Sequence, residues 1–180
     1  MSIAVIYGGT RKNSNSEILT EHAIQGIKTE KIFLRDYNIE AIMDMRHTEQ
    51  GFQDRQDDYN AIIDRILPHN ILLFSTPIYW YSMSGTMKNF IDRWSQSLRD
   101  PKYPDFKEKM AAKKAFVLAV GGDDPAIKGL PLIQQFQYIF DFMKMNFDGY
   151  ILGRGNKPGD ILLDKEALFS AAQMNHILKG

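Results

Sequence analysis

The fold of this chain is decided by residues 3–19, which read IAVIYGGTRKNSNSEIL. The first five of them are apolar and show no polar alternation, which indicates a strand buried on both faces, as in a parallel sheet. A polar loop with two glycines follows, and a helical pattern begins after it. A strand that feeds a helix through a short loop is the repeating unit of α/β folds.

The same alternation of apolar runs and helical patterns continues along the chain. The other predicted strands are 31–34, 71–75, 115–121 and 147–153. The predicted helices lie near 15–27, 55–67, 85–98, 130–145 and 164–178. This alternation predicts an α/β fold with a doubly wound parallel sheet and right-handed crossovers. Because no linker, repeat or low-complexity tract interrupts it, we expect a single domain over residues 1–180.

The composition excludes several classes of protein. The chain has 180 residues, no cysteine and a formal net charge of zero. The lack of cysteine rules out disulfides, Cys-ligated zinc, iron–sulfur clusters and a cysteine nucleophile. The neutral charge gives no support to nucleic-acid binding, and no apolar run is long enough to span a bilayer. We therefore expect a cytoplasmic protein that binds neither nucleic acid nor membrane.

The loop after the first strand has the composition of an anion site. In an open parallel sheet, ligands bind outside the carboxyl ends of the strands. Gly8 and Gly9 permit close backbone approach, and the start of the next helix offers unpaired N–H groups and a positive dipole end. Short donors and one cation accompany them, namely Thr10, Arg11, Ser14, Asn15 and Ser16. The loop is neither a Walker loop nor G-x-G-x-x-G, and the alternative is a polar turn closed by a helix cap.

A second segment, STPIYWYSMSGTMKNFIDRW at 75–94, follows the third strand. Pro77 ends that strand because it cannot donate to a ladder hydrogen bond. Three aromatic residues, Tyr79, Trp80 and Tyr81, then stand in a loop at the carboxyl end of the sheet. They suit a flat, apolar ring system with polar edges. A local aromatic cluster or a contact with another subunit is the alternative.

The pattern over 85–98 predicts an amphipathic helix with Ser84 as its N-cap and an i,i+4 pair between Lys88 and Asp92. Its polar residues, which we expect to point away from the apolar face, are Lys88, Asp92, Arg93 and Gln96.

Three other segments stand out in the sequence, and two of them bear on assembly. The pattern over 130–145 is apolar on more than one face, which favours contact with a second copy in a homodimer or homotetramer. Residues 36–54 and 99–113 carry no regular pattern and are expected to be long and irregular. For 99–113, a solvated excursion and a lid or dimer contact are both open.

Two motifs, GGTRKNSNSEIL at 8–19 and TPIYWYSMSGTMKNFIDRW at 76–94, resemble the NAD(P)H-dependent FMN reductase family of the flavodoxin superfamily. The chain is most similar to its small bacterial flavoproteins related to iron–sulfur flavoproteins. The resemblance continues through 57–66, 117–124 and 153–161, and so covers most of the chain. It implies a flavodoxin-like sheet of order 2-1-3-4-5. The cysteine cluster of the iron–sulfur branch has no counterpart in residues 39–56, so that route of electron transfer is absent.

The resemblance also assigns site residues by position. Those that match the FMN phosphate loop are Gly9, Thr10, Arg11, Ser14, Asn15 and Ser16. Those that match the segment along the ribityl chain and isoalloxazine are Pro77, Ile78, Tyr79 and Trp80, with Tyr81 and Ser82 at its edge. Those that match the loop on the pyrimidine side of the flavin are Gly121, Gly122 and Asp123.

The function implied by the resemblance is an FMN-dependent oxidoreductase. It takes hydride from NADH or NADPH and passes electrons to a small acceptor such as a quinone, a nitro or azo compound, or a flavin. Because the cofactor carries the chemistry, we expect no catalytic side chain. The four histidines lie far apart, so we expect no metal site.

The alternative function is that of a flavodoxin-like electron carrier, which binds FMN but does not react with NAD(P)H. The zero net charge counts against it, because carriers usually dock through an acidic face. A binding protein without cofactor would not need both loops. A signalling receiver domain would need an acidic cluster, whereas the first strand here ends in IYGGT.

Overall fold

The computed structural model describes residues 1–53 and 55–180, so Asp54, the last residue of the predicted irregular segment 36–54, lies outside the described residues. Five strands form one sheet of order β2-β1-β3-β4-β5, and every neighbouring pair is parallel. The strands are β1 (Ile3–Tyr7), β2 (Glu30–Phe33), β3 (Ile71–Pro77), β4 (Lys114–Gly121) and β5 (Asn146–Arg154). The predicted fold and strand order are confirmed.

The five predicted helices are present with different ends, the one predicted over 85–98 is divided in two, and the short helices at 106–111 and 125–128 were not predicted. The α-helices are α1 (Asn15–Ala23), α2 (Tyr59–Ile66), α3 (Gly85–Asp92), α4 (Trp94–Ser97), α5 (Phe106–Ala111), α6 (Pro125–Lys128), α7 (Leu130–Met143) and α8 (Lys165–Lys179). Two 3-10 helices, η1 (Leu34–Asp36) and η2 (Asp160–Leu163), complete the set. Within the described residues, no helix is both long and apolar enough to cross a membrane.

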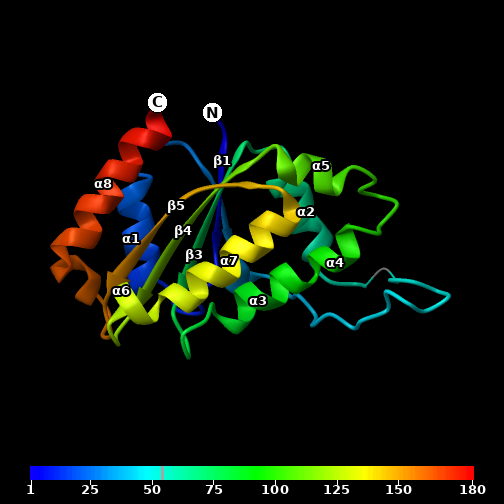
Figure 1. Cartoon of the computed structure of the whole chain (residues 1–180), viewed down its shortest axis with the longest axis horizontal. Helices are drawn as coiled ribbons and strands as arrows, with labels where there is room; N and C mark the ends of the chain where they lie inside the picture. The colour runs from blue at the N-terminus through cyan, green and yellow to red at the C-terminus, as the bar shows by residue number, and fades with distance from the viewer. Residues whose placement is uncertain (54) are drawn as a thin grey trace.

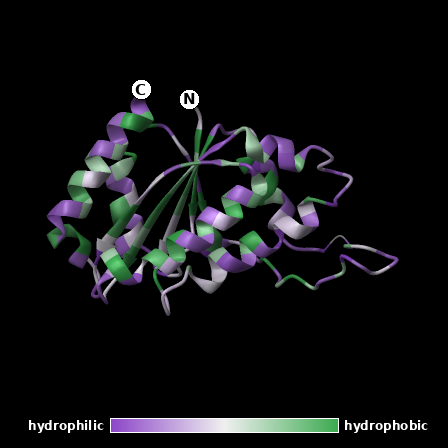
Figure 2. Ribbon diagram, in the orientation of Figure 1, coloured by the Kyte–Doolittle hydropathy of each residue, from purple (hydrophilic) through white to green (hydrophobic). Residues whose placement is uncertain are grey.

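The sheet separates two hydrophobic layers, which explains why its strands are apolar on both faces. Along β1, Ala4 and Ile6 face the layer that contains α2, α3 and α7, while Val5 faces the layer that contains α1 and α8. Figure 1 shows these helices on opposite sides of the sheet. In Figure 2 the hydrophobic colour gathers on the strands between the helical layers. The two helical layers leave the carboxyl ends of the strands open for a site.

One prediction about the third helical region is wrong. The single helix expected over 85–98 is divided at Arg93 into α3 and α4, and both Arg93 and Gln96 are buried rather than directed away from the core. Inside the protein, Arg93 Nη1 forms an ion pair with Asp57 Oδ2 at 2.5 Å, with both side chains at most 2% exposed, and Arg93 Nε donates to Gln96 Oε1 at 2.9 Å. Ser84 does cap α3, and Lys88 does pair with Asp92 at 2.6 Å, as predicted.

The two segments expected to be irregular differ from each other. Residues 99–113 contain a helix, α5, whose Phe106 and Met110 are buried, so that prediction is wrong in part. Residues 37–53 contain neither helix nor strand and project away from the sheet, in cyan in Figure 1. Their base is fixed to the body, because Asn89 Nδ2 donates to the Ile39 carbonyl at 2.6 Å and Arg93 Nη1 donates to the Glu40 carbonyl at 2.9 Å.

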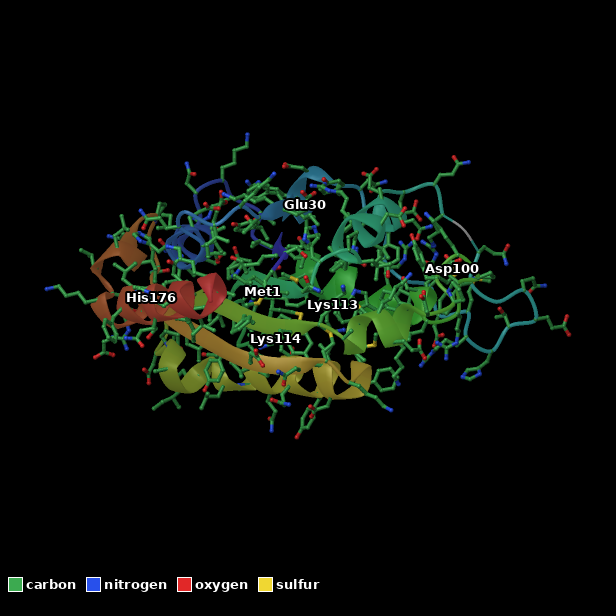
Figure 3. The ribbon with its side chains drawn as sticks, turned by 90° about the horizontal axis from the view of Figure 1, so that it is seen from above. Met1, Glu30, Asp100, Lys113, Lys114 and His176 are labelled. Carbon is green, nitrogen blue, oxygen red and sulfur yellow. The ribbon has the colours of Figure 1, made fainter. Side chains whose placement is uncertain are left out.

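The amino ends of the strands form the edge of the sheet that Figure 3 faces, where Glu30 and Lys114 begin their strands. Lys113, beside them, is buried and donates from Nζ to the Leu67 carbonyl at 2.6 Å, just after α2 ends. Burial lowers the pKa of Lys113 to about 8. Lys113 thus makes a structural contact at this edge, and the candidate site lies at the opposite edge.

Candidate functional site

The first predicted loop is held against the second by Ser84. Its hydroxyl donates to the Gly8 carbonyl at 2.7 Å and accepts from the Met87 N–H at 3.2 Å, while its own N–H donates to Thr76 Oγ1 at 3.0 Å. A Cβ on Gly8 would lie 2.9 Å from the Ser84 hydroxyl, so the close approach requires glycine. The cap of α3 thus also fixes the start of the first loop.

The end of the first loop forms a capped helix start. Ser14 Oγ accepts from the Glu17 N–H at 3.3 Å and lies 3.2 Å from Ser16 Oγ. Asn15 is buried, and its side chain donates to the Lys157 carbonyl at 2.9 Å and accepts from the Gly159 N–H at 2.9 Å. The side chain of Asn15 therefore holds the loop after β5, which leaves its backbone as the part that can face a ligand.

The aromatic segment is a tight turn. Tyr79 N–H donates to the Ser82 carbonyl at 2.9 Å and Ser82 N–H to the Tyr79 carbonyl at 3.0 Å. The two residues between them, Trp80 and Tyr81, have positive φ angles of 49° and 63°, which residues other than glycine rarely adopt. Ser82 Oγ donates to Gln135 Oε1 on α7 at 2.9 Å. Strain of this kind is typical of functional loops.

The indole of Trp80 is 93% exposed, so its position is set by the backbone of the turn and not by packing. We expect Trp80→Gly to raise the free energy of unfolding by about 1 kcal/mol, because glycine adopts positive φ without strain. Trp80→Ala, which keeps the strain but removes the ring, should give no such gain. Denaturant titration of both variants measures the difference, and a Trp80→Gly protein less stable than wild type would show that the ring packs on the body.

The second and third predicted segments are joined by side chains. Tyr81 Oη donates to Asp123 Oδ2 at 3.0 Å, and Lys128 Nζ lies 2.8 Å from each oxygen of the same carboxylate. The hydrogen bond from Lys128 and the weaker one from Tyr81 lower the pKa of Asp123 below its usual value. The carboxylate therefore links the aromatic turn to α6.

A cavity of about 200 Å³ lies where the three predicted segments meet. Its lining includes all the predicted residues of the first loop, Pro77–Tyr79 of the second segment, and Gly121 and Gly122 of the third. A smaller cavity of about 150 Å³ shares Ile78 with it and contains Trp80, Tyr81 and Asp123. Ser82 contacts α7 instead. The structure thus brings together residues from three distant parts of the sequence.

Three residues of the larger cavity were not among the predicted ones, namely Val120, Gly155 and Asn156. The signal for the last two was the run GRGN at 153–156, which spans the carboxyl end of β5 and the two residues after it. A groove of about 920 Å³ along the outer edge of β5 meets the cavity at Gly122, Gly155 and Asn156. The cavity therefore opens toward β5 as well as toward the aromatic turn.

The geometry matches a known family. The family model for NADPH-dependent FMN reductase covers residues 1–147. This chain belongs to that family. It is 60% identical over 174 residues to a Bacillus subtilis (strain 168) protein, YwqN, whose name describes an NAD(P)H-dependent FMN-containing oxidoreductase. The match covers 97% of this chain and 96% of that protein. The predicted family and its FMN-dependent oxidoreductase chemistry are confirmed.

Solved structures agree with the fold of this FMN reductase family member. It is similar to a Bacillus subtilis protein described as Trp repressor binding protein, with a TM-score of 0.83 and 54% identity over 96% of this chain and 97% of that one. An FMN-dependent NADH-azoreductase from Bacillus anthracis, solved in complex with FMN, has a TM-score of 0.72 at 12% identity and full coverage of both chains. The second likeness shows the fold alone.

The residues of this FMN reductase family member fit FMN. Hydroxyls, a guanidinium and a helix start stand at one end of the cavity and suit a phosphate. Gly121 and Gly122, which have no side chains, line the same cavity, and Gly121 packs so closely on Ile78 that an added Cβ would lie 3.1 Å from Ile78 Cβ. An aromatic turn lies alongside. A polar end and a flat apolar end are what a phosphorylated ring system needs.

Proposed function

We propose that this chain passes hydride from NADH or NADPH through FMN to a small acceptor such as a quinone, a nitro or azo compound, or a flavin. The observation that carries the proposal is the convergence of the three predicted segments on one cavity at the carboxyl edge of the sheet. FMN, when bound, supplies the hydride and electron chemistry. The chain supplies binding, orientation and a suitable field.

The first loop would hold the phosphate of FMN. Thr10, Ser14 and Ser16 offer hydroxyls, Arg11 offers a cation, and the start of α1 offers backbone N–H groups. Arg11 is exposed, so its side chain can reach a ligand without disturbing the core. By fixing the phosphate, this end of the cavity would fix the position of the whole cofactor.

The second and third segments would hold the ring system. Pro77, Ile78 and Tyr79 line the same cavity as Gly121 and Gly122. Backbone N–H groups at Gly121 and Gly122 would stabilise the negative charge that gathers on the pyrimidine side of a flavin upon reduction. The exposed Trp80 leaves the neighbouring face open to substrates. We assign no side chain as acid or base.

The reaction is tested by the absorbance spectrum of the purified protein. We expect flavin bands that bleach when NADH or NADPH is added without oxygen, and that return when a quinone or an azo dye is added. Flavin bands that persist with both nicotinamides would support the electron carrier instead. A protein without flavin bands, even after soaking with FMN, would contradict the proposed site.

The assembly is proposed from the outer face of α7. Tyr138 and Phe142 are 64% and 62% exposed, and Ile127 and Leu130 extend the apolar surface toward α6. An exposed apolar surface of this kind favours a homodimer or homotetramer. Light scattering after size exclusion measures the mass, and a monomer would contradict the proposal. The cysteine-free sequence supports a cytoplasmic location, which cell fractionation tests.

A further inference from the structure

Arg35, in η1 just after β2, reaches the first loop from outside it. Its Nη1 donates to the Arg11 carbonyl at 3.3 Å and to Glu17 Oε2 at 3.1 Å. The side chain of Arg35 is only 13% exposed and that of Glu17 only 14%. Neither the sequence pattern nor the cavity lining singles out this pair. It nevertheless connects the middle of the first loop to the first turn of α1.

The position of Glu17 explains why the contact matters. Ser14-x-x-Glu17 has the pattern of a capping box, in which the serine hydroxyl accepts from the glutamate N–H and the glutamate carboxylate accepts from the serine N–H. The first half of the box is present, since Ser14 Oγ accepts from the Glu17 N–H at 3.3 Å. Among residues 1–53 and 55–180 the second half is absent, because the carboxylate of Glu17 accepts from Arg35 instead.

A carboxylate in the capping-box position would compete with a phosphate. It would take up a backbone donor at the helix start, and its charge would repel the phosphate dianion. We propose that Arg35 is a positioning residue that holds Glu17 away from the helix start, so that the first loop is left free for the phosphate of FMN. The inference rests on the proposed function, in particular on the phosphate lying at this loop.

The side chain of Arg35 is held in place by packing against aromatic rings. Its guanidinium carbon lies 4.4 Å from the centre of the Phe33 ring, and that ring stacks on Tyr7 with centres 4.5 Å apart and planes 16° apart. Tyr7 in turn donates to Glu21 at 2.6 Å. The contact with the ring restricts where the guanidinium can move. Arg35 therefore holds Glu17 from a rigid base.

The test compares binding of FMN and riboflavin, which differ by the phosphate, to the apoprotein through flavin fluorescence. We expect wild type to bind FMN more tightly than riboflavin. Arg35→Gln should weaken FMN binding about 10- to 100-fold, the size of one charged hydrogen bond, and leave riboflavin binding unchanged. Adding Glu17→Ala to Arg35→Gln should restore most of the FMN affinity, because alanine can neither occupy the capping-box position nor repel the phosphate. Lys31→Gln, which breaks the exposed pair with Glu21, is the matched control and should change neither.

Each contrary result has a distinct meaning. Equal loss of FMN and riboflavin binding in Arg35→Gln would show that Arg35 only supports the fold, and would overturn the inference while the proposed function stands. Failure of Glu17→Ala to restore binding would also overturn it. Equal affinity of wild type for the two flavins would overturn the phosphate placement and the inference together. If Arg35→Gln does not fold, Glu17→Ala alone decides, because we expect it to retain full FMN affinity and a loss would contradict the inference.

Discussion

We expect Asp57→Asn to lower the free energy of unfolding by about 3–5 kcal/mol, because it leaves the buried guanidinium of Arg93 without a counter-charge. Asp57 and Arg93 are 2% and 1% exposed in their side chains, and their closest atoms are 2.5 Å apart. The same carboxylate accepts from the Glu40 N–H at 3.0 Å and from the Tyr59 N–H at 3.1 Å. The pair thus ties Glu40, near the start of the projecting segment, to Asp57, just before α2. Urea denaturation measures the loss.

Two further variants separate charge from packing. Asp92→Asn removes a carboxylate from the exposed pair with Lys88 and should change stability by less than about 0.5 kcal/mol. Asp57→Asn combined with Arg93→Met should recover part of the loss, because the buried charge is gone while the Asn oxygen can still accept from the backbone. A single Asp57→Asn variant as stable as wild type would contradict the role of the pair.

The same pair makes stability depend on acid. Burial acts to raise the pKa of Asp57, but hydrogen bonds from Arg93 and from the Glu40 and Tyr59 N–H groups outweigh it, so the pKa lies below its usual value of 3.8. The folded state therefore binds the proton less readily than the unfolded state. This stabilisation is fully present above the unfolded pKa and is lost as the pH falls through the folded one. Below about pH 4, wild type should lose stability more steeply than Asp57→Asn.

The second large effect concerns the cofactor. Arg11→Ala should weaken FMN binding by about 1.5–3 kcal/mol, or about 10- to 100-fold, through the loss of one charged hydrogen bond to the phosphate. Riboflavin binding should be unchanged, because riboflavin has no phosphate. Because Arg11 is exposed, we expect Arg11→Ala to leave the stability of the fold unchanged. Fluorescence titration of the apoprotein with both flavins measures it.

Arg99→Ala is the matched control for Arg11→Ala. Arg99 is also exposed, and it donates to the Ser95 carbonyl at 3.1 Å on α4, outside the cavity lined by Arg11. The Arg99→Ala variant removes the same charge from the chain and should leave FMN binding unchanged. Equal effects of the two variants would indicate a general influence of net charge. An unchanged affinity in Arg11→Ala would place the phosphate on another part of the site.

Much of the site could be predicted because its signals are local in the sequence. The three central strands are short apolar runs, and the candidate segments continue from the strands that present them, as Gly8 follows β1 and Gly122 follows β4. Parallel strands bring their carboxyl ends to one edge, so local signals at separate strands predict a shared site. For the same reason the cap at Ser84 was predictable from its place before α3.

The sequence by itself determined the alternation of strands with the main helices and the family, and it predicted which loops would face a ligand. Only the tertiary structure decided which polar side chains are paired with groups far away in the sequence: Arg93 is buried against a carboxylate 36 positions away, and Asn15 is bonded to a carbonyl 142 positions away. The physical reason is that apolar periodicity is written along neighbouring residues, whereas a hydrogen bond or ion pair depends on which distant groups the folded chain brings within about 3 Å.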